Sequence, residues 1–199
     1  MYALVEDNEI TKLISYPKSM VIGDVQYPSK IFQLWTIAEK EAIGIYEVVF
    51  DNSNFKDEQW YINTNQSFAF ADNTVTASYG TATPKAYADS NGVDENGDEL
   101  NPIVVIEGLK TTLIKTLKLQ VANILANTDW YITRNAEKET AIPSAISTYR
   151  DSVRTKQASM ETAITNASDT PALETLYTYT TDSDGVQSRP LGELPTLNI

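Results

Sequence analysis

Residues 125–154 read LANTDWYITRNAEKETAIPSAISTYRDSVR and connect two segments with a helical pattern. Before this stretch, large apolar residues recur every four positions: Leu109, Leu113, Leu117, Val121 and Leu125. That period predicts an amphipathic helix over 109–126, about 27 Å long. Pro143 and Ser144 mark the start of a second helix, because proline is favoured in a first helical turn. Its predicted buried face holds Ile146, Tyr149, Val153, Met160 and Ile164. Two such helices predict an antiparallel helical hairpin over 106–168.

The first 80 residues favour strands. Two apolar runs, 2–5 and 10–15, flank the turn-forming sequence Glu-Asp-Asn-Glu, so they predict a β-hairpin. Thr36 is followed three residues later by Glu39, which predicts a capping box at the start of a short helix. Gly44 is expected to end that helix.

Further strands are expected in the same region. Residues 45–50 are β-branched and aromatic, and segments 59–63, 67–71 and 74–79 are joined by short turn-like links. The last three predict an antiparallel meander whose apolar residues are Trp60, Ile62, Phe68, Phe70 and Val75. Within it, Trp60 and Ile62 should share one face, as should Phe68 and Phe70. The expected class is α+β, with a small antiparallel β-rich domain at 1–80 followed by the helical hairpin and an extended C-terminal arm.

Residues 81–105 predict an acidic loop or linker, since they contain Asn-Gly pairs and few large apolar side chains. Asp94, Asn96 and Asp98 alternate like the first oxygen ligands of a calcium loop. The sixth position is Glu99 instead of glycine, and the twelfth is Val105 instead of glutamate. A solvated acidic loop is therefore the favoured interpretation, and calcium is the weaker alternative.

The end of the chain, residues 169–199, should form a short helix and then an extended arm. Asp169 or Thr170 can cap a helix over 171–177, and prolines at 190 and 195 exclude a regular helix beyond it. Four large aliphatic residues occur at intervals of two or three positions along the arm: Leu191, Leu194, Leu197 and Ile199. Such residues either fold back on their own domain or dock on a neighbour, and we assign them as a partner-docking arm.

Composition excludes several kinds of chemistry. The chain has neither cysteine nor histidine, so thiolate nucleophiles, Cys-ligated zinc and histidine-based catalytic triads are impossible within it. The net charge of −12 argues against a nucleic-acid groove. No apolar run is long enough for a membrane span and no signal peptide begins the chain, which predicts an unprocessed soluble protein. We find no glycine-rich phosphate loop and expect no cofactor and no catalysis.

One set of residues resembles a sequence signature found in proteins of tailed bacteriophages. The set consists of Leu125, Thr128-Asp129-Trp130, Ile142-Pro143 and Tyr149-Arg150, followed by Arg154. It is similar to the "TDW … P … YR" pattern of tail assembly chaperones and tail-fibre-associated proteins, and the resemblance covers roughly residues 109–168. It implies a structural corner made by Asp129, Trp130, Tyr149 and Arg150. In that corner Tyr149 or Arg150 braces the turn, with an Asp129–Arg150 ion pair.

The resemblance implies a structural virion component of a phage tail, at the baseplate or at the tail-fibre attachment region. It would be made in the cytoplasm of the host bacterium and act by docking other tail proteins, in several copies arranged symmetrically. The alternative is a tail-fibre assembly chaperone that is absent from the virion. A third possibility is a receptor-binding or peptidoglycan-degrading tail protein, which would need a sugar-stacking cleft or a pair of carboxylates across a cleft.

Overall fold

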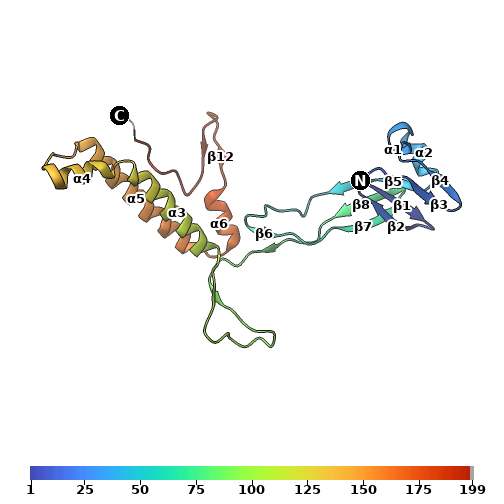
Figure 1. Ribbon diagram of the computed structural model, residues 1–199, viewed down its shortest axis with the longest axis horizontal. Coiled ribbons are helices and arrows are strands. Elements are labelled where there is room, and N and C mark those ends of the chain that lie inside the picture. Colours follow the sequence, from blue (N-terminus) through green and yellow to red (C-terminus); the bar gives the residue numbers. More distant parts are fainter. Residues whose placement is uncertain (198–199) are drawn as a thin grey trace. The chain divides into compact units, whose positions relative to one another are not determined.

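The computed structural model describes residues 1–197 and divides the chain into two compact units, Met1–Thr83 and Pro84–Ile199. Both strands and helices are present, which confirms the α+β class (Figure 1). The boundary lies three residues beyond the predicted end of the β-rich domain. Most of the predicted linker therefore belongs to the second unit.

The first unit contains a five-stranded sheet with the order β2-β1-β5-β8-β7. Its strands are β1 (Tyr2–Glu6), β2 (Glu9–Ile14), β5 (Ile45–Asp51), β7 (Ser67–Ala71) and β8 (Thr74–Ser78). The predicted hairpins β1–β2 and β7–β8 are confirmed. In each hairpin the two central turn residues have positive φ, as a type I′ turn requires; they are Asp7-Asn8 and Asp72-Asn73. In contrast, β5 and β8 pair in parallel, with Val48 opposite Val75.

A β-bulge in the first hairpin lets one strand supply both faces of the sheet. Val5 pairs with Ile10 and Leu4 pairs with Lys12, so Thr11 is the extra residue. Ile10 and Ile14 would share a face in a regular strand, but the bulge places them on opposite faces. Ile10 packs against one cluster of buried side chains and Ile14 belongs to the other.

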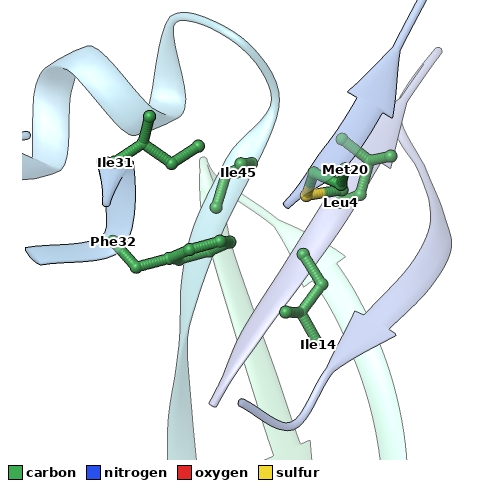
Figure 2. Close-up of a cluster of buried hydrophobic side chains, with 6 residues drawn as sticks. All are labelled: Leu4, Ile14, Met20, Ile31, Phe32 and Ile45. Carbon is green, nitrogen blue, oxygen red and sulfur yellow. The ribbon is translucent and has the colours of Figure 1, made fainter. Parts of the chain in front are cut away.

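Two apolar clusters therefore pack around the sheet strands of the first unit. One comprises Ala3, Val5, Val48, Val75 and Ala77. The other comprises Leu4, Ile14, Met20, Ile31, Phe32 and Ile45. Figure 2 shows this second cluster, in which Ile31 and Phe32 of α1 (Ile31–Leu34) face the side chains of the sheet strands. A hairpin of β3 (Met20–Ile22) and β4 (Val25–Tyr27) adds Met20.

The helix α2 (Ile37–Glu41) begins with the predicted capping box. Glu39 N donates to Thr36 Oγ1 at 3.3 Å, and Thr36 N donates to Glu39 Oε2 at 2.8 Å. Gly44 follows the helix with φ +80°, and its carbonyl accepts a 2.8 Å hydrogen bond from Val5 N. A Cβ at Gly44 would lie 2.5 Å from Val5 O, so this turn also ties the helix to the sheet.

The predicted three-stranded meander is wrong. Segment 59–63 does not join the sheet; only Tyr61–Ile62 forms a strand, β6, which pairs with β9 (Thr83–Pro84). The Asn63 side chain accepts from Lys56 N (2.9 Å) and donates to Lys56 O (2.8 Å). These bonds close 56–63 as a loop. Trp60 is consequently buried while Ile62 is exposed, so the two do not share a face.

The second unit is built on the predicted helical hairpin, α3 (Leu109–Ala126) and α5 (Ser144–Asn166). The two helices are antiparallel, because Lys110 Nζ donates to Thr165 O at 2.8 Å and Arg150 Nη1 donates to Leu125 O at 2.9 Å. α6 (Thr170–Tyr177) packs on α5 and is capped by Asp169, whose Oδ1 accepts from Ala172 N at 2.8 Å. The buried side chains of the unit include Leu117, Val121, Ile146, Val153, Met160, Ile164 and Leu173.

The connection between α3 and α5 contains a helix that the sequence pattern did not predict. α4 (Asp129–Lys138) ends at Glu139, whose φ of +53° closes the helix. None of its ten residues is buried, so the apolar periodicity that revealed α3 and α5 is missing from it.

The segment before α3 caps that helix. Leu109 N donates to Ala86 O (2.9 Å), Lys110 N to Tyr87 O (3.0 Å) and Gly108 N to Asp89 Oδ1 (2.8 Å). These bonds satisfy amides that an isolated helix would leave without partners. A side chain at Gly108 would meet the backbone of Ala88. Between the cap and α3, β10 (Ser90–Asn91) and β11 (Val105–Ile106) pair at the base of a long loop.

The Asp89 cap should make stability depend on pH. The Gly108 amide, the Thr111 hydroxyl and the charge of Lys115 all lower the pKa of Asp89. This contribution to stability is present above about pH 4 and is lost as pH falls through the lowered folded pKa. Asp89→Asn, which keeps an acceptor oxygen, should therefore lower the urea midpoint at about pH 7 and have a smaller effect at about pH 3, below the ordinary aspartate pKa. The control Asp184→Asn should change neither midpoint. An equal loss for Asp89→Asn at both pH values would contradict the prediction.

The described part of the predicted arm folds back on its own unit, which is the alternative to docking that the sequence left open. After a hairpin of β12 (Thr180–Thr181) and β13 (Gln187–Ser188), Leu191 is buried. Its amide donates to Leu176 O at 3.0 Å and its carbonyl accepts from Lys156 Nζ at 2.9 Å. Leu194 and Leu197 are half-buried, and Ile199 lies outside the described residues.

Within residues 1–197, no helix combines the length and apolar content needed to cross a membrane.

Candidate functional site

The residues of the "TDW … P … YR" pattern meet at the end of α3, around the side chain of Arg150. Arg150 Nη1 lies 2.9 Å from Leu125 O, 2.6 Å from Thr128 Oγ1 and 2.9 Å from Asp129 Oδ1. Only 9% of the Arg150 side chain is exposed, and Thr128 is buried. One guanidinium nitrogen thus links two helices and the turn between them.

The electrostatics of this corner explain why an arginine suits it. The last carbonyls of α3 have no partner within the helix and carry partial negative charge. Leu125 O accepts from Thr128 N (3.0 Å) and Thr128 Oγ1 (2.9 Å) as well as from Arg150. Asp129 stands in the first turn of α4, where the helix dipole favours a carboxylate. Arg150 therefore balances both the carbonyl end of α3 and the Asp129 carboxylate.

The other two predicted corner residues have different roles. Trp130 does not contribute to the Arg150 network; it is 51% exposed and stacks on Tyr131, with the Arg134 guanidinium 4.7 Å from its ring centroid. Tyr149 is half-buried and does not brace Asp129. Instead it lines a pocket of about 330 Å³ together with Ile124, Asn127, Thr128, Leu194, Pro195, Thr196 and Leu197. The folded-back arm forms one wall of this pocket.

Removing the Asp129 carboxylate should lower stability measurably. Asp129→Ala is expected to cost about 1 kcal/mol, because it leaves a largely buried guanidinium with a missing partner. The cost stays small because the Asp129 side chain is 60% exposed and solvent screens the pair. Asp151→Ala, which removes an exposed partner of Arg154, is the matched control and should cost less than about 0.5 kcal/mol. An unchanged thermal midpoint for Asp129→Ala would refute the bracing role.

The calcium candidates form a turn that uses its own carboxylate. Asp94 Oδ1 accepts from Asp98 N (3.0 Å) and Asn96 N (2.8 Å), and these bonds lower the pKa of Asp94. Such a pattern is typical of an Asx turn. Across residues 1–197, no group of three or more His, Cys, Asp or Glu side chains is placed to hold a metal ion.

An exposed apolar surface lies in the same loop, and the sequence analysis missed it. We define the β10–β11 loop as residues 90–106. Five of its aliphatic side chains are each at least 50% exposed: Val93, Ile103, Val104, Val105 and Ile106. The loop also holds four carboxylates and no basic residue. The sequence feature that could have revealed this surface is the uncharged aliphatic run 103–106. It was overlooked because it crosses the predicted boundary between the linker and the helical module.

The first unit contributes a second concave site. A pocket of about 390 Å³ is lined by Ile37, Glu41, Tyr46, Glu47, Val48, Val49, Asn73 and Thr74. Its polar lining offers the carboxylates of Glu41 and Glu47, the Asn73 amide and the hydroxyls of Tyr46 and Thr74.

The chain matches no family model, no curated protein and no solved structure. Its own surfaces, and the pattern of residues around Arg150, therefore carry the functional proposal.

Proposed function

We propose that the protein is a structural component of a bacteriophage tail, at the baseplate or at the fibre attachment region, and that it acts by docking and not by catalysis. The observation that carries the proposal is the Arg150 corner. Arg150 belongs to the phage-like pattern and contacts two other members of it, through a hydrogen bond to Thr128 and an ion pair with Asp129. Because these residues of the pattern bond to one another in the fold, we interpret the pattern as the signature of a structural module.

The second unit also offers surface for docking. The β10–β11 loop exposes five aliphatic side chains, four of them consecutive at 103–106, and clustered exposed apolar side chains commonly mark sites of protein–protein contact. In this proposal the neighbours are other tail or fibre proteins, several copies share one particle, and the protein resides in the virion tail.

A tail-fibre assembly chaperone is the second candidate. The same corner supports it, because the resemblance covers chaperones and virion proteins alike. An exposed aliphatic loop suits a chaperone that holds a partner temporarily. The separate β-rich unit favours the virion component, since simple members of the chaperone family contain little beyond the helical module.

Peptide mass spectrometry on purified, nuclease-treated phage particles separates the two candidates. A virion component should appear at an abundance comparable with that of other tail proteins. Infected-cell lysate is the control, because a chaperone should be abundant there and absent from particles. Absence of the chain from particles would overturn the virion role.

A further inference from the structure

The β10–β11 loop contains both Asn-Gly pairs of the chain, Asn91-Gly92 and Asn96-Gly97. Asparagine is a thermolabile residue, and a glycine after it has no Cβ to obstruct a reaction between the side chain and the backbone. In that reaction the glycine nitrogen attacks the asparagine Cγ and forms a new N–C bond. The Cγ–Nδ2 bond breaks, and Nδ2 leaves as ammonia with the proton that the glycine nitrogen gives up. Water then opens the cyclic imide at either carbonyl, which yields an aspartate or an isoaspartate.

The fold protects the first pair. Asn91 lies in β10, and its Nδ2 donates to Glu99 Oε1 at 2.8 Å. Gly92 is buried, and its nitrogen donates to Val104 O at 2.7 Å. The group that would leave and the nitrogen that would attack are therefore both held by residues on the other side of the loop. Ring closure here requires the pairing between the two sides to open first.

The second pair lies at the exposed tip of the loop, where a Cβ on Gly97 would meet no described atom within 4 Å. Asn96 N donates to Asp94 Oδ1 at 2.8 Å, and Gly97 N donates to Asp94 O at 3.1 Å. The Asp98 and Asn96 amides lower the pKa of Asp94, and the Asn96 side chain adds to this shift. These contacts all come from Asp94, two or three positions away. A turn held by such local contacts opens without disturbing the rest of the unit.

A turn of the same form in the β12–β13 hairpin has an aspartate at the matching position. Asp182 Oδ1 accepts from Asp184 N and Val186 N, each at 2.9 Å, and Gly185 N donates to Asp182 O at 3.1 Å. Gly185 has a positive φ, as does its counterpart in the first turn. The aspartyl product of the reaction therefore fits a turn of this form. The isoaspartyl product lengthens the backbone by a methylene group, and its turn would have to rearrange.

We propose that Asn96 is a site of spontaneous deamidation in the folded protein and that the fold protects Asn91. The reaction adds a carboxylate to the four already present at 94–99. The new charge arises in the same loop as the exposed aliphatic residues 103–106. The inference goes beyond the proposed function, because the reaction needs only water and no partner.

Peptide mapping of the purified full-length protein tests the assignment. The protein is aged in water enriched in the heavy oxygen isotope, at a mildly alkaline pH where the glycine nitrogen loses its proton more readily. Residues 86–110 form one tryptic peptide, so fragment ions compare both asparagines within the same peptide. The label should enter at residue 96 about tenfold faster than at residue 91, or more, because only the second pair reacts without opening the strand pairing.

Two controls separate the effect of the fold from that of the sequence. In concentrated urea both asparagines should react at similar rates, because each is followed by glycine. Asp184→Asn places an Asn-Gly pair in the matching turn of the β12–β13 hairpin, and residue 184 should then take up label at a rate comparable with that of residue 96. If residue 184 stayed unlabelled in this variant, the local turn would not explain the reactivity.

Two results from the folded protein would overturn the proposal. One is an equal rate of labelling at residues 91 and 96. The other is the absence of label at residue 96 under conditions in which both asparagines react in urea. Either result would leave the mass-spectrometry test of the virion role unaffected.

Discussion

Arg150→Met is expected to lower the free energy of unfolding of the second unit by about 3 kcal/mol. The substitution keeps an unbranched apolar stem but removes the group that bonds Leu125 O, Thr128 Oγ1 and Asp129 Oδ1. Hydrogen bonds made by a charged group contribute about 1.5–3 kcal/mol each, and the guanidinium makes such bonds to Thr128 Oγ1 and Leu125 O. We expect a total of about 3 kcal/mol because Asp129 is 60% exposed and can be hydrated after the change. Urea unfolding followed by far-UV circular dichroism measures the effect, since the long helices belong to the second unit.

The control for this substitution is Arg154→Met. Arg154 lies one helical turn further along α5, is 52% exposed and pairs with Asp151 at 3.3 Å. Its loss should cost less than about 0.5 kcal/mol, as is usual for exposed ion pairs. Combining Arg150→Met with Asp129→Ala should cost less than the sum of the single changes, because both remove the same interaction. Equal costs for Arg150→Met and Arg154→Met would show that the corner does not stabilise the unit.

Gly44→Ala should destabilise the first unit by about 3 kcal/mol. The φ of +80° alone disfavours an L side chain by about 1–2 kcal/mol. The new Cβ would also stand 2.5 Å from Val5 O, a backbone atom of β1 that cannot rotate away. Relief requires the turn to separate from β1, which would strain the 2.8 Å bond between Val5 N and Gly44 O. Urea unfolding followed by tryptophan fluorescence in a Trp130→Phe background reports on this unit.

Gly23→Ala separates the two causes. Gly23 has φ +56°, but a Cβ there meets no described atom within 4 Å. It should therefore lose only the conformational part, about 1 kcal/mol. If both alanine variants lost the same stability, the close approach to Val5 would have no energetic consequence.

Features with a strong local pattern were predictable from the sequence. The α3 boundaries follow from a four-residue apolar period, and the α2 start follows from Thr36 and Glu39. The β1–β2 and β7–β8 hairpins follow from short turn sequences between apolar runs. In each case neighbours in the chain supply the interaction.

Features that depend on distant residues were not predictable. Nothing in residues 45–51 indicates that β5 lies parallel to β8, because pairing partners are set by the whole sheet. Residues 59–63 have strand-like composition, yet the Asn63 side chain closes a loop onto Lys56. At the corner, the Asp129–Arg150 pair is present as the resemblance implied, but the exposure of Trp130 depends on α4, a helix with no buried residue.

The caps of α3 make this helix dependent on the rest of its unit. Its first two amides bond to Ala86 O and Tyr87 O, and Leu125 O near its end accepts from Arg150, so both ends rely on residues outside the helix. An isolated 18-residue peptide would have to form without both caps, and helices of this length are marginal in water. The second unit should therefore fold and unfold cooperatively. Its α3 amides should exchange with deuterium only through global opening, and proteolytic cleavage near Ala88 should release both helices together.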